Sequence, residues 1–358
     1  MRLGLFTASV TVASRLVRLT TIPVPAPDPL SFGGWTSTLP DSAAMEAIVP
    51  LQFRLATMCA ALAWATGVVA DSSSPRLAAY YDRFMALCGD TAYEWSDEES
   101  PRKLTSGARQ VGVGRANRYV LDRGGSVLAW EGNAREPDRV LGGVRAMHAG
   151  RSGLLLIRDD GSLWHVPTRS VVGFGETLFA TPARIAANAV TAAVGDGADY
   201  YVTEDATLYV KGRADRGQYG DGNLTATDDF MRSARDVTQV VAHTGHALLL
   251  KRDGSVWGTG GNIYGPLGRH GHGDKAIAWG PIFDDAHAIA TGSSHSVAIR
   301  RDGSLWIWGR NEGLDPRRVK ARVTAVAAGN DSTIALSEGA LWQWRTGARP
   351  RRVMGCGP

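Results

Sequence analysis

The feature that most constrains the fold of this chain is an internal repeat. In its clearest copies a small-residue segment ending in glycine leads to an apolar run, then to Asp-Gly-Ser, and then to Leu-Trp or Val-Trp. Asp-Gly-Ser begins at Asp160, Asp253 and Asp302, and four degenerate copies keep the same order of segments. The position of the first aromatic residue falls at 93, 128, 164, 209, 257, 306 and 342, with Leu128 replacing the aromatic residue once. Seven copies at spacings of 35 to 49 residues indicate a repeat architecture.

Each copy predicts a small antiparallel β-sheet. The apolar runs are short, and the Asp-Gly or Gly-Asp pairs between them are typical of two-residue hairpins, in which glycine tolerates positive φ. One such sheet cannot bury its faces alone, so the copies have to stack on one another. Radial stacking gives an all-β fold, a seven-bladed β-propeller of four-stranded antiparallel blades, which leaves only short edges. Composition agrees, because eight of the 11 Trp fall in the repeat register.

The segment before the repeats predicts an N-terminal leader over residues 1–70. After Arg54, residues 55–70 form an uncharged, mostly apolar run of 16 residues. That length is short for a membrane span of ~20 residues but matches the core of a signal peptide. We expect the signal-like segment 54–70 to direct export to the periplasm, the cell surface or the medium, and translation to start later than Met1. A buried helix is the alternative.

The propeller is then expected to occupy residues 71–358, with the repeats at about 75–353 and no transmembrane span in the mature chain. Within the repeats, Val323–Gly329 holds Val-x-x-Val-Ala-Ala-Gly, Trp306–Gly309 holds Trp-x-Trp-Gly, and His246 and His295 each follow such a small-residue segment. In these residues the chain resembles the regulator of chromosome condensation repeat family, as an exported bacterial member, and both histidines occupy that family's histidine position. The resemblance implies a seven-bladed β-propeller, and both histidines are expected to be structural.

Two cysteines remain in the predicted mature chain, Cys88 in the first repeat and Cys356 after the last. The first and last blades of a closed ring are neighbours, so a disulfide between them would hold the ring closed, and export would permit it. Two buried free thiols are the alternative, because the sequence does not give their separation.

Basic residues recur in four repeats within a Pro-x-x-Val or Pro-x-x-Leu step. These are repeats one, two, six and seven, which are contiguous around a closed ring. Equivalent positions in adjacent blades align, so we expect an arc of cations that binds a protein partner or an anionic surface. The arc consists of Arg102, Lys103, Arg139, Arg317, Arg318, Arg351 and Arg352. Two alternatives are that these charges only prevent edge pairing, and that partners bind the long loops of repeats three to five.

The sequence lacks the motifs of nucleophilic, nucleotide-binding and zinc-dependent enzymes. We therefore predict an exported, monomeric binding module without catalysis, without a cofactor and without a specific nucleic-acid ligand. One alternative is a metal-dependent lyase or hydrolase with a site near the central channel, for which His270, His272 and Asp274 are weak ligand candidates. A second is a guanine-nucleotide exchange or chromatin-binding factor, which the family resemblance implies.

Overall fold

The computed structural model describes residues 76–357 apart from 116, 171–176 and 271–272. The predicted leader 1–70, with its signal-like segment 54–70, lies outside the described residues. The described part of the chain consists of 29 strands and their connections. None of it forms a helix long and apolar enough to cross a membrane.

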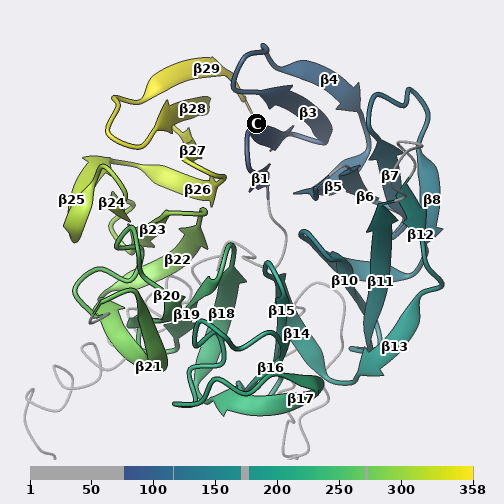
Figure 1. Ribbon diagram of the computed structural model, residues 1–358. Helices are drawn as coiled ribbons and strands as arrows, with labels where there is room; N and C mark the ends of the chain where they lie inside the picture. Colours follow the sequence, from purple (N-terminus) through teal and green to yellow (C-terminus); the bar gives the residue numbers. More distant parts are fainter. Residues whose placement is uncertain (1–75, 116, 171–176, 271–272, 358) are drawn as a thin grey trace, which may run out of the picture. The chain divides into compact units, whose positions relative to one another are not determined.

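The strands form seven antiparallel sheets around a central axis (Figure 1). Blade 1 holds β1 (Leu77–Tyr80), β2 (Arg83–Cys88), β3 (Thr91–Ser96) and β4 (Arg102–Thr105), and blade 2 holds β5 (Ala108–Val113), β6 (Asn117–Asp122), β7 (Val127–Glu131) and β8 (Asp138–Leu141). Blade 3 holds β9 (Val144–Ala149), β10 (Gly153–Arg158), β11 (Leu163–Ser170), β12 (Thr177–Phe179) and β13 (Ala183–Ala186), and blade 4 holds β14 (Ala189–Val194), β15 (Ala198–Thr203), β16 (Leu208–Gly212) and β17 (Thr227–Ala234).

The remaining three blades complete the ring. Blade 5 holds β18 (Val237–Ala242), β19 (His246–Lys251), β20 (Val256–Gly261) and β21 (Lys275–Phe283), and blade 6 holds β22 (Ala286–Thr291), β23 (His295–Arg300), β24 (Leu305–Gly309) and β25 (Gly313–Lys320). Blade 7 holds β26 (Val323–Ala328), β27 (Ser332–Ser337), β28 (Ala340–Arg345) and β29 (Arg351–Gly355). The predicted propeller of four-stranded blades is confirmed, and among the described strands only blade 3 carries a fifth, β12.

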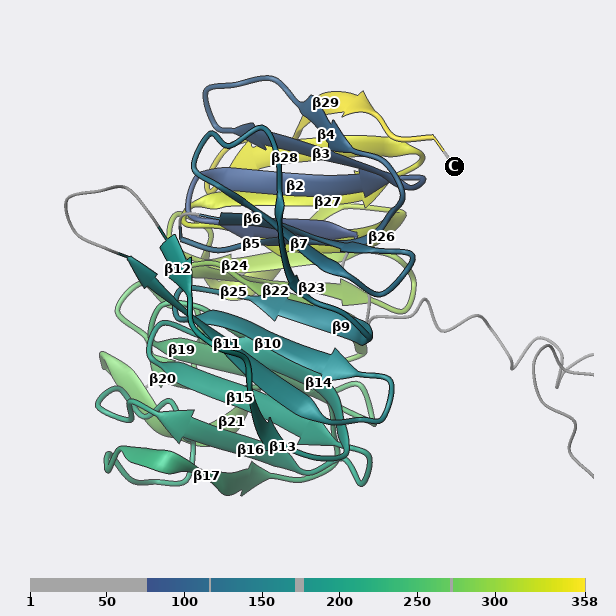
Figure 2. The same cartoon turned by 90° about the vertical axis from the view of Figure 1, so that its right-hand side faces the viewer.

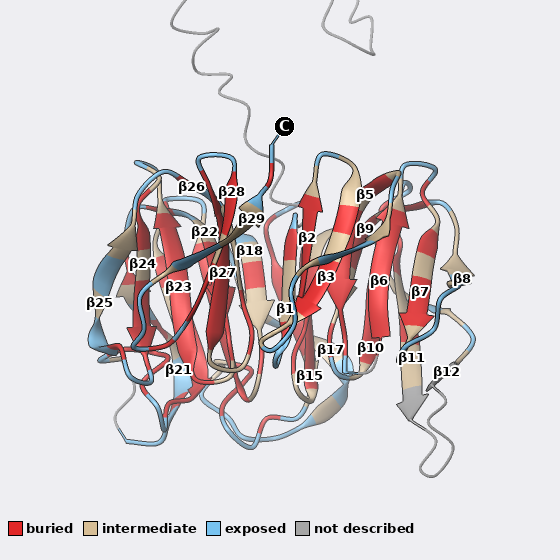
Figure 3. Ribbon diagram, turned by 90° about the horizontal axis from the view of Figure 1, so that it is seen from above, coloured by how far each residue is buried: buried red, intermediate tan, exposed pale blue. Residues whose placement is uncertain are grey.

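Each blade runs from its first strand at the axis to its fourth strand at the rim (Figure 1). Figure 2 shows the same ring from its side. Because the strands alternate in direction, the connections between first and second strands and between third and fourth strands lie at one end of the ring, here called the loop face. The hairpins between second and third strands and the links to the next blade lie at the other end, the turn face. Burial is greatest in the second strands, such as β19 and β27, and the outer strands β25 and β29 are largely exposed (Figure 3).

The Asp-Gly-Ser-x-Trp motif is a structural unit of the turn face. In blade 3 the Asp160 carboxylate accepts hydrogen bonds from the amide and hydroxyl of Ser162, and that hydroxyl accepts one from Trp164 Nε1 at 2.9 Å. Blades 5 and 6 repeat these contacts around Asp253 and Asp302. The motif therefore recurs because one side chain closes the hairpin and positions the aromatic ring of the third strand.

The glycine that ends the first strand is required by close packing between blades. A Cβ at Gly292 would lie 2.2 Å from the carbonyl oxygen of Gly329, and one at Gly329 would lie 2.2 Å from that of Tyr81. Real Cβ atoms do not approach oxygen so closely, so larger residues would push neighbouring blades apart. The glycines of the repeat thus set the small radius of the inner ring.

Blade 1 and blade 7 meet without a shared sheet, since β1–β4 and β26–β29 are each built from one end of the described chain. A disulfide joins Cys88 to Cys356 at the turn face, with 5.0 Å between the two Cα atoms. At the loop face, the Asp97 carboxylate accepts hydrogen bonds from Ser332 and Gln343. An apolar cluster of both blades fills the space between: Leu77, Phe84, Ala86, Trp95, Ile334, Leu336, Leu341 and Cys356. We call this junction the seam.

Removing the disulfide should destabilise the ring. For the double variant Cys88→Ala/Cys356→Ala we expect a loss of up to ~5 kcal/mol in the free energy of unfolding, because the bond closes a long loop in the unfolded chain. The loop spans 268 residues. Denaturant titration would measure the loss. A reducing agent should lower the midpoint of the wild type and leave that of the variant unchanged, and equal midpoints for oxidised and reduced wild type would contradict the expectation.

Candidate interaction surfaces

The third and fourth strands of every blade share one irregularity, a shift of register immediately before the aromatic position. One residue of the fourth strand is skipped, as in a β-bulge, which bends the strand and fixes the direction of the next side chain. The residue that pairs with the aromatic position is Lys103, Arg139, Arg184, Arg232, Pro281, Arg318 and Arg352 in blades 1 to 7. Paired residues project from the same side of a sheet, so this position is equivalent in all blades.

All seven cations predicted from the sequence are exposed on outer strands. Three of them interact within their own blade. Arg102 pairs with the buried carboxylate of Glu94 at 2.8 Å, and Arg317 pairs with that of Glu312. Arg351 donates to Gln343 Oε1 at 3.2 Å. These three cations neutralise or orient buried groups, and they are not free for a partner.

The other four are Lys103, Arg139, Arg318 and Arg352, and they occupy the equivalent position of blades 1, 2, 6 and 7. Within the described part of the chain none of them makes an ion pair or a side-chain hydrogen bond. Adjacent residues of a strand point to opposite sides of the sheet. In blades 1, 6 and 7, one cation of each adjacent pair therefore contacts a group of its own blade, and the other does not. We call these four residues the rim arc; it crosses the seam.

The local charge balance favours cations around the seam. The outer strands β25, β29 and β4 carry seven basic residues and one acidic residue, Asp315, which pairs with Arg269. Asp302 interacts electrostatically with Arg318 of the rim arc. The hydroxyl and amide of Ser304 lower the pKa of this carboxyl, and Arg318 adds to the effect. Blades 6, 7 and 1 therefore present a cationic sector of the rim.

The loop face has a different character. The exposed large apolar side chains of the described residues are Tyr81, Leu224, Ile263, Tyr264, Ile277 and Leu314. Each lies in a connection of the loop face or within three residues of one. The exposed large apolar side chains of the described residues are therefore concentrated at the loop face.

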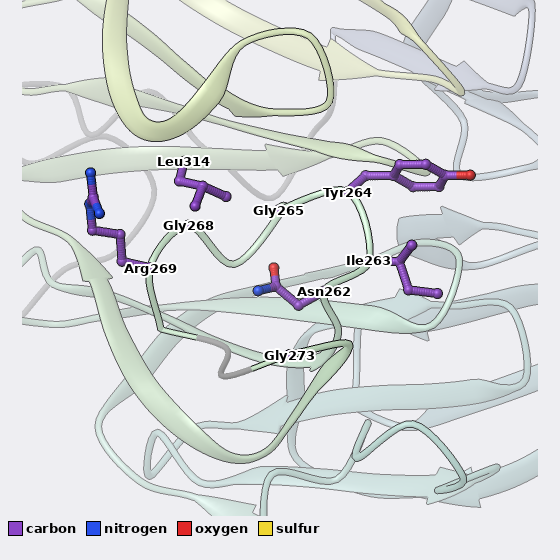
Figure 4. A pocket seen from close by; sticks show the side chains of 8 residues that line it. All are labelled: Asn262, Ile263, Tyr264, Gly265, Gly268, Arg269, Gly273 and Leu314. Carbon is purple, nitrogen blue, oxygen red and sulfur yellow. The ribbon is translucent and has the colours of Figure 1, made fainter.

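A cavity of about 510 Å³ lies within this apolar region, between blades 5 and 6 (Figure 4). It is lined by Asn262, Ile263, Tyr264, Gly265, Gly268, Arg269, Gly273 and Leu314. The guanidinium of Arg310 lies 4.8 Å from the ring centre of Tyr264. Gly265 has a φ of +77°, and a Cβ there would lie 2.5 Å from Leu314, so this wall requires glycine.

The repeat histidines lie near the axis and link neighbouring blades. His246 Nε2 hydrogen-bonds to Thr291 Oγ1, and His295 Nε2 to Thr333 Oγ1 at 2.9 Å. Burial lowers the pKa of His246 to about 3 and that of His295 to about 4. Both are neutral at pH 7 in this environment, in agreement with the structural role expected from the sequence.

A third histidine makes a contact across the central axis at the loop face. His243 of blade 5 stacks on Tyr80 of blade 1, across the ring, with 5.4 Å between the ring centres. Tyr81 also contacts it, at 5.9 Å. The sequence pattern did not reveal this contact, because His243 ends a first strand, whereas the family's histidine begins a second strand.

The weak metal candidate is only partly described. His272 lies outside the described residues. His270 Nε2 lies 3.1 Å from the carbonyl oxygen of Ala278, and Asp274 accepts a backbone hydrogen bond from Asn262 through its own carbonyl. Among described residues, no three His, Cys, Asp or Glu side chains are grouped so that they could hold a metal ion.

Comparison with known proteins places the fold. Residues 286–312, in blade 6, match the family model of the regulator of chromosome condensation (RCC1) repeat. Among solved structures, the chain is similar to Prp20p from Saccharomyces cerevisiae, with a TM-score of 0.62 and 17% identity over 73% of this chain and 82% of that one. It is also similar to human WBSCR16, with a TM-score of 0.59 and 16% identity over 71% and 84% of the two chains.

The ectodomain of the Arabidopsis thaliana receptor kinase ACR4 is a third similar structure, with a TM-score of 0.52 and 13% identity over 78% of this chain and 98% of that one. Identities this low show a shared fold and nothing more. The chain is a seven-bladed β-propeller closed by a disulfide, and one of its blades matches the RCC1 repeat.

Acid should weaken the contacts between blades 6 and 7. Since burial lowers the pKa of His295 to about 4, the unfolded chain binds a proton more readily than the folded one between pH 6.5 and 4. The stability contributed by neutral His295 is present above pH 6.5 and is lost as pH falls through 4. We expect His295→Gln to reduce the loss of unfolding free energy between pH 7 and pH 4 by ~3 kcal/mol.

Denaturant titrations at pH 7 and pH 4 would measure this difference. His287→Gln is the matched control, because His287 is exposed on the neighbouring strand β22. The control should keep the acid sensitivity of the wild type. If His295→Gln keeps it as well, the buried histidine is not its source.

Proposed function

We propose that the protein is an exported interaction module that binds an anionic partner on the rim arc and has no catalytic activity of its own. The proposal depends on one observation: of two adjacent cations on an outer strand, one interacts with its own blade and the other does not. Arg102, Arg317 and Arg351 interact with groups of their own blades. The rim arc points the other way and interacts with no described group through an ion pair, so its charges are available to a partner.

Protection of sheet edges does not account for the rim arc. Charged residues and bulges are both used to prevent edge strands from pairing. Each outer strand already has a bulge, and in blades 1, 6 and 7 it has a second cation beside the arc residue. A further cation adds little protection against pairing of the edge strands. Its fixed register position in four consecutive blades does, however, align positive charge along the rim.

The disulfide supports the exported setting. Disulfides form and persist in oxidising compartments, and they are rare in proteins of the cytosol. The bond between Cys88 and Cys356 therefore agrees with the signal-like segment 54–70 predicted from the sequence. An exported, monomeric module with a cationic rim would meet anionic proteins or surfaces outside the cytosol.

The alternatives are less well supported. The similar protein Prp20p has binding properties to Gsp1p and histones, but a cationic rim would repel basic histones, and the disulfide argues for another compartment. A metal-dependent lyase or hydrolase would depend on His270, His272 and Asp274, and retention of metal after purification would favour it. A protein partner on the loop face is the second candidate, favoured by the apolar residues around Tyr264.

Charge reversal tests the rim arc. Arg318→Glu/Arg352→Glu should weaken binding of a ten-residue oligoglutamate peptide by at least about tenfold at low salt, since two attractive contacts become repulsive. Fluorescence anisotropy would measure the affinity. Arg235→Glu/Arg252→Glu is the matched control: both residues are exposed, lie away from the arc and change the net charge equally. Equal weakening by the two variants would show that only net charge matters and would refute the arc.

A further inference from the structure

The register position of the rim arc is basic in two more blades. Arg184 pairs with Trp164 in blade 3, and Arg232 pairs with Tyr209 in blade 4. Both arginines are exposed, and neither makes an ion pair with a described residue. Blade 5 alone departs, with Pro281 opposite Trp257. Together with the rim arc, these residues form a set of six that we call the rim belt: Lys103, Arg139, Arg184, Arg232, Arg318 and Arg352.

The rim belt runs without interruption through six neighbouring blades, from blade 6 across the seam to blade 4 (Figure 1). In each of these blades the residue after the cation is the one skipped by the register shift. The bulge thus holds all six cations on the same side of their blades. The result is a line of charge around the circumference, one cation for each blade.

The geometry of this line restricts the partner. A compact protein or a flat surface reaches one sector of a ring, so it can contact the cations of two or three neighbouring blades. A flexible linear polyanion can bend around the rim and contact all six in turn. We propose that the rim belt binds a flexible acidic polysaccharide that wraps around the propeller; this rests on the proposed function and names its partner.

The surroundings of the belt favour a polysaccharide over single-stranded nucleic acid. Proteins that bind single strands without sequence preference use exposed aromatic rings on which bases stack. Here three of the rings next to the belt are covered by other cations. Arg158 lies 5.6 Å from the ring centre of Trp164, Arg300 lies 4.4 Å from that of Trp306, and Lys320 lies 3.7 Å from that of Trp342. Five of the six belt residues are arginines, whose planar forks match carboxylates in pairs.

Each single contact of the belt is weak. Asp160 and Asp302 interact with Arg184 and Arg318, and Asp138 precedes Arg139 in the chain. Partial neutralisation of this kind and screening by salt limit the binding of a short anion at one blade. A long chain gains affinity because later contacts form within one complex. Affinity should therefore depend on the length of the polymer.

The test uses size-fractionated polygalacturonate, a linear polyuronate, with the mature protein and isothermal titration calorimetry. Long chains should bind at least about tenfold more tightly, per chain, than tetramers. Arg184→Gln/Arg232→Gln should weaken binding of long chains by about tenfold and leave binding of tetramers unchanged, because tetramers occupy the more basic sector of blades 6, 7 and 1. Arg235→Gln/Arg252→Gln is the control for lost charge, and thermal melting checks that every variant is folded.

The outcomes distinguish the proposal on the rim belt from the proposed function of the rim arc. If Arg318→Gln/Arg352→Gln abolishes binding and Arg184→Gln/Arg232→Gln has no effect on long chains, the belt is refuted and the proposed function stands. If no rim variant changes binding of polygalacturonate or oligoglutamate, both are refuted. If oligothymidylate of equal charge binds more tightly than polygalacturonate, the assignment to a polysaccharide is overturned.

Discussion

The closure of the ring between blades 1 and 7 is the interaction on which the rest of the structure depends. A propeller is closed only when its terminal blades are held together, and here no described strand crosses from one blade to the other. The seam is instead fixed at both ends: by the disulfide of Cys88 and Cys356 at the turn face and by the Asp97 hydrogen bonds at the loop face. Trp95 adds a buried hydrogen bond to Gln343 at 3.0 Å. A covalent bond is suited to this junction, because no shared sheet joins the two blades.

The rim arc depends on the same junction. Arg318 and Arg352 lie on one side of the seam, and Lys103 and Arg139 lie on the other. The order of charges along the rim is therefore a property of the closed ring, and the chain brings these residues together from its two ends. The seam also explains why Gln343 has several contacts: it accepts from Trp95 and Arg351 and donates to Asp97. Gln343 therefore both joins the two terminal blades and contacts a cation of the outer strand β29.

The sequence predicted the fold but only part of the candidate site. Repeats recur along the chain, so turn motifs such as Asp302-Gly-Ser304 and the first-strand glycines determine blade number and strand order. The separation of free cations from paired ones depends instead on pleat and register. Arg317 and Arg318 are adjacent in sequence, yet one pairs with buried Glu312 and the other faces outward. The sequence analysis missed Arg184 and Arg232, because Arg232 lacks the Pro-x-x-Val step and long insertions precede both residues. Alignment of the outer strands on the residue that the register shift skips would have found them.

The distribution of charge matters more here than its total. A formal net charge of +4 over 358 residues indicates no particular partner. Charges interact strongly only within a screening length of ~8 Å, so a local excess determines what a surface binds. The outer strands of blades 6, 7 and 1 have such an excess, whereas acidic residues such as Asp160, Asp253 and Asp302 are used in the hairpins of the turn face. The bulge that recurs in every blade turns this excess into a regular line, so the repeat that builds the fold also spaces its charges.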